Sequence, residues 1–444
     1  FTLDGAMNGA TYNTTIGYSS LSGITTGGYN TAVGGRALDS VVTGTGNAAV
    51  GFDAGGVYTG GGGVFMGYEA GLSLVSGDTA LIGYQAGKRM VGTGNVGLGY
   101  GVLYGASSTA ANNTGTYNTA VGVQALKWVS KTIGSTAVGA EAGYYTTGSY
   151  NTFMGYKAGY GGTTSAPYSS GQYNVAMGYN AFEAVTTGNL NVAIGYQALS
   201  KETIGISTVA IGDNAGSQQV FGTAASTYNT LVGSNAGFWN VTGTGNTYIG
   251  NASGTGASGN SNNNNTAVGN SALQNITTAN QNVALGGGAG NDITTGGSNV
   301  ILGYNAGDAM TDNQGNVVIG EDAFGNANSG EHYNIAIGYR AGLGVDNALS
   351  DHSILIGRNA GVGGSGKMDA CVVIGGFALD ATGANSKTGI VSIGYETMTN
   401  VTTGGSVAIG HRAAKDLTTG GNNTAVGYEA MENATGASNT AVGA

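Results

Sequence analysis

The chain has 444 residues, of which 88 are glycine and one is proline, and its net charge is −10. Basic residues form no cluster, so neither nucleic acid nor an anionic membrane surface is an expected partner. No run of 18 apolar residues is present, which argues against insertion into a membrane as a helix, and the single cysteine, Cys371, excludes an intrachain disulfide.

One short pattern, Asn-Thr-Ala-Val-Gly-Tyr-x-Ala, recurs along the whole chain. Its glycine occurs in 25 copies, 16 to 23 residues apart, and 17 is the commonest spacing. A short period of this kind is typical of a solenoid, in which each copy forms one coil on the previous one. We therefore predict a single continuous repeat region over residues 1–444, as a fragment of a longer fibre protein.

The residues before each glycine predict a short β-strand. An aliphatic residue or Met directly precedes the glycine in all 25 copies, as at Ile16 and Val33. Thr, Val or Ile stands three residues before the glycine in 23 copies, and a small residue such as Ala32 lies between. Alternate strand residues point to opposite faces, so we expect Val, Thr and Ile on one face and Ala on the other, with both faces packed.

The residues after the strand predict a corner and a second strand. The glycine, for example Gly34 or Gly195, is expected at a corner where a side chain would clash or where φ is positive. A small residue three positions later, such as Ala198, would let neighbouring backbones approach. A Thr-Thr-Gly segment follows in many copies, as at 25–27, and we interpret it as a second short strand that ends in a turn.

Two further positions predict columns of side chains along the stack. Asn stands four residues before the glycine in 17 copies, including Asn30 and Asn191, and stacked amides can hydrogen-bond as a ladder. Tyr follows the glycine in 11 copies, where ring stacking is favoured over sugar binding. We assign a structural role in the repeat to six representative residues: Asn30, Gly34, Asn191, Ile194, Gly195 and Ala198.

Three long spacings predict loops. Gaps of 23 residues follow Gly99 and Gly155, and a gap of 21 follows Gly212. Insertions in solenoids become loops on one face, often the binding face, although neutral decoration is the simpler alternative. Trp128 and Trp239 are secondary candidates for contacts. The candidate receptor-contact residues in these loops are Tyr104, Tyr117, Tyr160, Tyr168, Tyr173 and Tyr228.

No residue pattern predicts catalysis. His332, His352 and His411 fall in different repeats, and no second metal-ligand type keeps a fixed spacing with them. No Ser-His-Asp or Cys-His set can be assembled. We therefore expect neither an enzyme nor a bound metal or cofactor.

The repeat resembles two known families. The stretch 191–199 resembles the head repeats of trimeric autotransporter adhesins, although the adhesin repeat is shorter. The stretch 423–430, with its Thr-Thr-Gly spacers, is more similar to bacteriophage tail fibres. The repeat count predicts an all-β, parallel β-solenoid of about 25 short coils, and the resemblance implies that it is a left-handed β-roll. The resemblance also implies an intertwined or side-by-side homotrimer.

The leading functional hypothesis is a segment of a phage or phage-like tail fibre that attaches to a host surface. Its expected partners are other copies of the chain and a glycan or protein receptor on the host, and its expected location is the virion tail or the cell exterior. The alternative is a bacterial cell-surface adhesin or a structural extracellular filament. An ice-binding solenoid is disfavoured, because adjacent threonines point to opposite faces of a strand.

Overall fold

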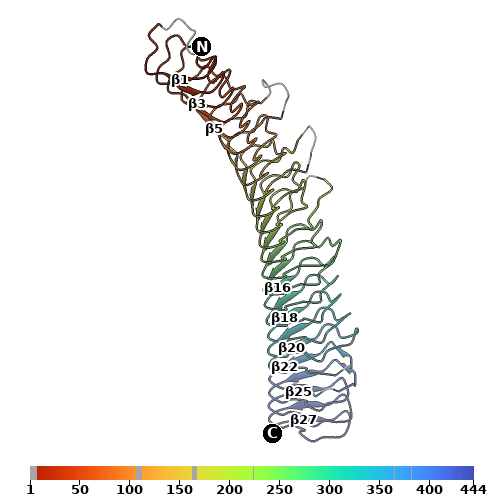
Figure 1. Cartoon of the computed structure of the whole chain (residues 1–444). Helices are drawn as coiled ribbons and strands as arrows, with labels where there is room; N and C mark the ends of the chain where they lie inside the picture. The colour runs from red at the N-terminus through yellow and green to blue at the C-terminus, as the bar shows by residue number, and fades with distance from the viewer. Residues whose placement is uncertain (1–7, 107–112, 163–167, 224, 365, 382) are drawn as a thin grey trace. The chain divides into compact units, whose positions relative to one another are not determined.

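The computed structural model describes residues 8–444 except 107–112, 163–167, 224, 365 and 382. The chain divides into two compact units, Phe1–Thr227 and Tyr228–Ala444, and each unit is a stack of short coils (Figure 1). The regular structure of the described residues is entirely β-strand, without a helix. The prediction of an all-β parallel solenoid is confirmed, with about 24 coils where the repeat count predicts 25.

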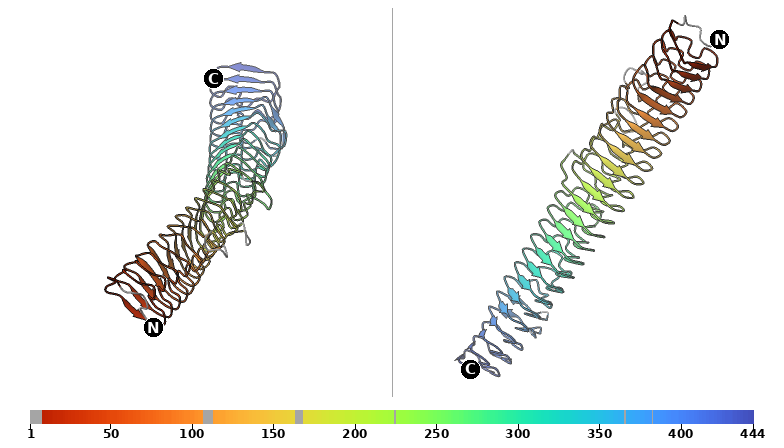
Figure 2. Two further views of the ribbon diagram at one scale, coloured as in Figure 1. Left: turned by 90° about the horizontal axis from the view of Figure 1, so that it is seen from above. Right: turned by 90° about the vertical axis from the view of Figure 1, so that its left-hand side faces the viewer.

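In the first unit, each coil contributes one strand of three or four residues. Each strand pairs in parallel with the strand of the next coil, as where Ala32 of one strand aligns with Ala49 of the next (Figure 2). The strands of the described part of this unit are β1 (Thr14–Ile16), β2 (Thr31–Val33), β3 (Ala48–Val50), β4 (Gly63–Met66), β5 (Thr79–Ile82), β6 (Val96–Leu98), β7 (Thr119–Val121), β8 (Thr136–Val138), β9 (Thr152–Met154), β10 (Val175–Met177), β11 (Val192–Ile194) and β12 (Val209–Ile211).

The second unit repeats this arrangement, with one additional pair of two-residue strands, β21 (Met368–Asp369) and β23 (Lys387–Thr388), beside the main sheet. Main-sheet strands pair in parallel from coil to coil, as where Ala336 aligns with Leu355. The described main-sheet strands of this unit are β13 (Thr230–Val232), β14 (Thr247–Ile249), β15 (Thr266–Val268), β16 (Val283–Leu285), β17 (Val300–Leu302), β18 (Val317–Ile319), β19 (Ile335–Ile337), β20 (Ile354–Ile356), β22 (Val372–Ile374), β24 (Val391–Ile393), β25 (Val407–Ile409), β26 (Thr424–Val426) and β27 (Thr440–Val442).

The expectation that both strand faces are packed is wrong for the single chain. The central strand residue points into the coil and is fully buried, as at Ala32 and Ala193. The flanking residues, such as Val192 and Ile194, point outward and are only partly buried. The small residue therefore belongs to the core, because the interior of so narrow a coil has little room, and the β-branched residues form the outer face of the sheet.

The second predicted strand is absent from most of the described coils. The Thr25–Gly27 segment is a bend, and the main strand is followed by tight turns; the exceptions are β21, β23 and isolated bridges such as that between Thr146 and Ser169. The N–H groups of Thr25 and Thr26 both donate to the carbonyl of Val42 in the next coil, at 2.9 and 3.2 Å. Two successive N–H groups of an extended strand point in opposite directions, so this shared acceptor requires a bent backbone. The segment still stacks in register.

The repeat glycine is required for two separate reasons. Gly34 and Gly195 both have a φ of +134°, which side chains rarely adopt. A Cβ on Gly34 would also lie 2.7 Å from the carbonyl carbon of Gly51, the equivalent glycine of the next coil. Substitution would therefore strain the backbone and separate the two coils.

The turn residue four positions after the repeat glycine shares the core with the central residue of the strand, and the size of one varies with the size of the other. Where the centre is a buried alanine, as at Ala32, a large residue such as Leu38 often fills the core from the turn. Where the centre is large, as at Phe65, the turn position is Gly71, and a Cβ there would lie 2.5 Å from Cδ1 of Phe65. The same exchange occurs at the pairs Phe153–Gly159, Leu231–Gly237, Tyr248–Gly254 and Leu355–Gly361.

Buried asparagines form a hydrogen-bonded ladder. The side-chain oxygen of Asn30 accepts the backbone N–H of Asn47 at 3.0 Å, and its amide donates to the carbonyl of Gly44 at 2.9 Å. Asn191 bonds in the same way to the N–H of Thr208, at 2.9 Å, and to the carbonyl of Gly205, at 2.8 Å. Each amide thus satisfies one donor and one acceptor of the next coil, which would otherwise be buried without partners.

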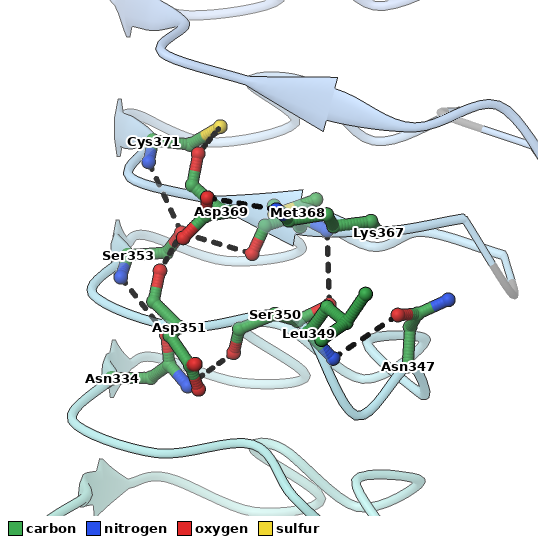
Figure 3. Close-up of polar contacts among 10 residues, drawn as sticks. All are labelled: Asn334, Asn347, Leu349, Ser350, Asp351, Ser353, Lys367, Met368, Asp369 and Cys371. Atoms are coloured by element: carbon green, nitrogen blue, oxygen red, sulfur yellow. Dashed lines mark hydrogen bonds and ion pairs between the residues drawn. The ribbon is translucent and has the colours of Figure 1, made fainter.

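The ladder continues where other small polar residues replace asparagine (Figure 3). The N–H of Ser353 donates to the side-chain oxygen of Asn334, at 2.9 Å, and the hydroxyl of Ser353 accepts the N–H of Cys371, at 3.1 Å. That hydroxyl also donates to the carbonyl of Met368, at 3.2 Å. Burial raises the pKa of the Cys371 thiol, so this cysteine is a neutral member of the ladder.

Our first prediction concerns the volume exchange in the core. Phe65→Ala should lower the free energy of unfolding by about 3–5 kcal/mol, because it leaves a cavity. Gly71→Leu should also destabilise, because the new side chain overlaps the Phe65 ring. In the double variant the introduced leucine should fill the cavity, so a double-mutant cycle by denaturant unfolding should give a favourable coupling of about 1–3 kcal/mol. The control, Phe153→Ala with Gly71→Leu, should be additive.

A second prediction concerns the ladder. Asn191→Ala should lower the free energy of unfolding by about 2–4 kcal/mol, because it leaves the N–H of Thr208 and the carbonyl of Gly205 unpaired. Asn191→Ser should cost less, since Ser135 at the equivalent position accepts the N–H of Asn151, at 3.1 Å. Asn189→Ala, two residues away at a partly exposed position, is the control: it removes a bond to the exposed N–H of Gln172, which water can replace, so it should cost less than Asn191→Ala. Equal losses for Ala and Ser at position 191 would contradict the ladder.

Candidate functional site

The strongest candidate site is a group of aromatic and cationic side chains on the first unit, which we call the Trp128 cluster. Its members lie five or six residues after the repeat glycine of successive coils, or in the longer connection after Gly155. The Trp128 cluster consists of Arg89, Tyr104, Lys127, Trp128, Tyr144, Tyr145, Tyr160 and Tyr168.

Backbone hydrogen bonds between coils hold these residues in one column. The N–H of Arg89 donates to the carbonyl of Tyr104, and the N–H of Trp128 donates to that of Tyr144, both at 3.0 Å. The N–H of Tyr145 donates to the carbonyl of Tyr160, at 2.7 Å. Because the coils stack in register, large side chains at this position must lie against one another.

The insertion after Gly155 brings a further ring to the cluster. Tyr168 stacks on Trp128, with ring centres 6.2 Å apart and planes 20° apart, and it also stacks on Tyr145, at 5.7 Å. Tyr104 meets Trp128 edge to face, at 6.0 Å. Trp128 is therefore packed between rings from an earlier coil and from a later connection.

Two cations of the cluster contact rings rather than carboxylates. The guanidinium carbon of Arg89 lies 4.9 Å from the centre of the Tyr104 ring. The Nζ of Lys127 lies 5.1 Å from the Trp128 ring centre and donates to the hydroxyl of Tyr144, at 3.0 Å. Neither cation forms an ion pair with a carboxylate among the described residues. Two such cations in a chain of net charge −10 form a local positive patch.

The cations and rings border a small open cavity of about 190 Å³. Two glutamine side chains, Gln85 and Gln124, complete its polar lining, and Tyr100 also lines it. The amide of Gln85 donates to Glu69, at 2.7 Å, and Glu69 is itself paired with Lys88, at 2.5 Å. The carboxylate that contacts Gln85 is thus already neutralised.

Burial keeps some of the tyrosines protonated. Desolvation is the largest cause that raises the pKa of Tyr160 and of Tyr145, and neighbouring tyrosines raise both further. Both phenols therefore remain O–H donors at neutral and mildly alkaline pH. The cluster accordingly presents apolar ring faces, neutral hydroxyls and amides, and two positive charges.

The predicted contact residues fall into three places. Tyr104, Tyr160 and Tyr168 belong to the Trp128 cluster. Tyr117 and Tyr173 lie at exposed turn positions with φ of 57°, and Tyr173 stacks on Tyr150, at 5.2 Å.

Tyr228 is an exposed residue of the second unit. In that unit Trp239 packs edge to face on Phe238, with ring centres 5.0 Å apart. The tips of the two longest insertions, 107–112 and 163–167, lie outside the described residues.

Sequence reasoning missed Arg89, Lys127, Tyr144 and Tyr145 as site residues. The signal was present, because all four stand five or six residues after a repeat glycine and neighbouring coils align at that distance. The tyrosines that directly follow the glycine form separate exposed columns, as where Tyr84 stacks on Tyr100, at 5.4 Å.

The described residues offer no group of three or more histidine, cysteine or acidic side chains that could hold a metal ion. In the same part of the chain, no helix has the length and apolar character needed to cross a membrane. Comparison with protein-family models, with curated proteins and with solved structures finds no match to this chain.

Outside the cluster, the second unit buries a carboxyl group. Glu331 is fully buried, and its Oε2 accepts a hydrogen bond from the amide of Asn313, at 2.7 Å. Desolvation raises the pKa of Glu331 from its ordinary 4.5 to about 7, and the nearby charge of Asp346 acts in the same direction. The folded chain therefore holds this proton more tightly than the unfolded chain does.

A third prediction follows from Glu331. As pH rises from 4.5 to about 7, the unfolded chain loses this proton before the folded chain, so stability falls across this window. The loss should total about 3–4 kcal/mol, at roughly 1.4 kcal/mol per pKa unit over the shift from 4.5 to about 7. In denaturant unfolding measured between about pH 4 and pH 8, Glu331→Gln should remove this part of the dependence of stability on pH. The pH dependence that remains in the variant comes from the other carboxyl groups. An unchanged pH dependence in the variant would contradict the assignment.

Proposed function

We propose that the chain is a structural segment of a trimeric attachment fibre of the phage tail-fibre type, which contacts a glycan or protein receptor on a host surface. The parallel solenoid supports this proposal, because a continuous stack of short coils provides length and a repetitive surface. The resemblance of 423–430 to tail-fibre repeats supports it as well. The virion tail or the cell exterior is the proposed location.

The observation that carries the proposal is the exposed outer face of the strands. In each unit the strand residues that point outward are largely apolar, and several expose more than a third of their surface. A contiguous apolar patch of this kind is typical of an interface. The partly exposed strand residues are Val50, Met66, Val96, Leu98, Met154 and Ile211 in the first unit, and Ile249, Leu285, Val300 and Ile409 in the second.

A second copy of the same chain is the proposed occupant of this face. The face repeats with the period of the coils, so only a partner with the same period can cover it along its length. An equivalent chain meets this requirement, and closed symmetric assemblies are the usual form of homo-oligomers. Further copies of the chain would also bury the outer strand residues that a single chain leaves partly exposed.

Our fourth prediction is that native mass measurement in solution gives three times the chain mass of 43.5 kDa. Leu285→Lys should weaken this assembly, because it places a charge on the outer strand face, where Leu285 is 39% exposed. Leu349→Lys is the matched control, since Leu349 is 63% exposed and lies outside the strands.

A stable monomer, or equal effects of the two lysines, would overturn the trimer. Saturable adsorption of the fluorescently labelled assembly to intact bacterial cells tests attachment separately. An assembly that adsorbs to no cell in a panel of bacterial hosts would overturn the attachment role while leaving the fibre architecture in place.

A further inference from the structure

We infer that the Trp128 cluster binds a carboxylated saccharide, with a sugar ring against the aromatic side chains and its carboxylate at Arg89 and Lys127. This inference rests on the proposed attachment function and specifies the class of ligand. It depends on three observations: an aromatic column that ends at the cavity, two cations without carboxylate partners among the described residues, and amides beside them.

The aromatic column provides a platform for a ring. Phe52, Tyr68, Tyr84 and Tyr100 stack in successive coils, with ring centres 5.2 to 5.7 Å apart. The column ends at Tyr100, because the next coil has Val123 at the same position. Tyr100 lines the cavity and is 51% exposed. A flat aromatic face at the end of a column can accept the apolar C–H face of a sugar ring, as it accepts another ring within the column.

The two cations favour a carboxylate. Arg89 and Lys127 line the same cavity from neighbouring parts of the stack. A guanidinium can donate two parallel N–H groups to one carboxylate, and an ammonium adds a point charge. Arg89 and Lys127 keep their charge available beside the cavity. By contrast, six other cations among the described residues lie 2.5 to 3.3 Å from carboxylates of the chain itself: Arg36, Lys88, Arg340, Lys367, Arg412 and Lys415.

The remaining lining suits hydroxyl groups. Gln85 and Gln124 each carry an amide with donor and acceptor atoms, and sugar hydroxyls can use both. The cavity is small and open, which fits one ring of a longer chain rather than a fully enclosed ligand. A nucleic acid is a weaker fit, because its many phosphates would meet the net negative charge of the chain on either side of this local patch.

Tryptophan fluorescence provides the test. Trp128 and Trp239 are the only tryptophans, so the Trp239→Phe variant leaves Trp128 as the sole reporter at the cavity. The probes are the methyl glycosides of glucuronic acid, galacturonic acid and N-acetylneuraminic acid. Each has a neutral counterpart of the same ring: the glucoside, the galactoside and the methyl ester.

We expect at least one acidic probe to change Trp128 fluorescence saturably and to bind about tenfold more tightly than its neutral counterpart, since loss of a charge-assisted hydrogen bond is worth about one factor of ten. Arg89→Gln with Lys127→Gln should abolish this preference. The control variant, Lys131→Gln with Lys201→Gln, changes the net charge by the same amount at two cations that do not line the cavity. It should keep the preference for the acidic probe.

The inference is overturned if no acidic probe binds, if acidic and neutral probes bind equally, or if the control variant loses binding as the cavity variant does. Tighter binding of a short single-stranded oligonucleotide would also overturn it. The mass of the assembly and its adsorption to cells are measured independently. If the protein is a trimer that adsorbs to cells but binds no saccharide at Trp128, the inference about the ligand is refuted while the proposed attachment function stands.

Discussion

Parallel backbone hydrogen bonding between successive coils is the interaction on which the remaining structure of each unit depends. The strands, the corner glycines and the bent Thr-Thr-Gly segments all form backbone hydrogen bonds with neighbouring coils, as where the N–H of Gly34 donates to the carbonyl of Ile16 in the preceding coil, at 2.7 Å. A one-residue shift would turn every strand side chain to the opposite face. The glycine corner reinforces the register, because a Cβ on Gly34 would collide with the Gly51 carbonyl.

Because the coils stack in register, equivalent positions of the repeat form columns of side chains along the stack. Different columns have different structural roles. The asparagine column satisfies buried backbone groups, and the strand-centre column fills the core together with the turn four residues after the glycine. Interiors are close-packed, so a large residue in one column requires a small one opposite, as Phe65 requires Gly71. The fold can therefore tolerate variation within a column provided that the sum of facing volumes is preserved.

The sequence predicts the repeat, the strand position and the parallel solenoid, because alternation of Thr, Ala and Val before a glycine is local information. It does not reveal which strand face is internal, since both faces carry apolar residues. The decisive constraint is the volume inside the coil. Small Ala32 fills it together with the large Leu38, and large Phe65 fits only because the turn residue is Gly71. The second strand was predicted wrongly because Thr-Thr is compatible with an extended backbone, whereas the shared acceptor at Val42 bends it.

The Trp128 cluster shows why a site on a repetitive scaffold is hard to read from one copy. No single coil contains it: Arg89, Tyr104, Trp128 and Tyr145 belong to four coils, and Tyr168 reaches Trp128 from a connection beyond them. Each of these residues is an ordinary variation in its own repeat. Their proximity follows only after the coils are placed one layer apart, at the strand spacing of about 4.8 Å. On such a scaffold, specificity therefore arises where neighbouring copies depart from the repeat at the same position, and the search for a site becomes a search along columns.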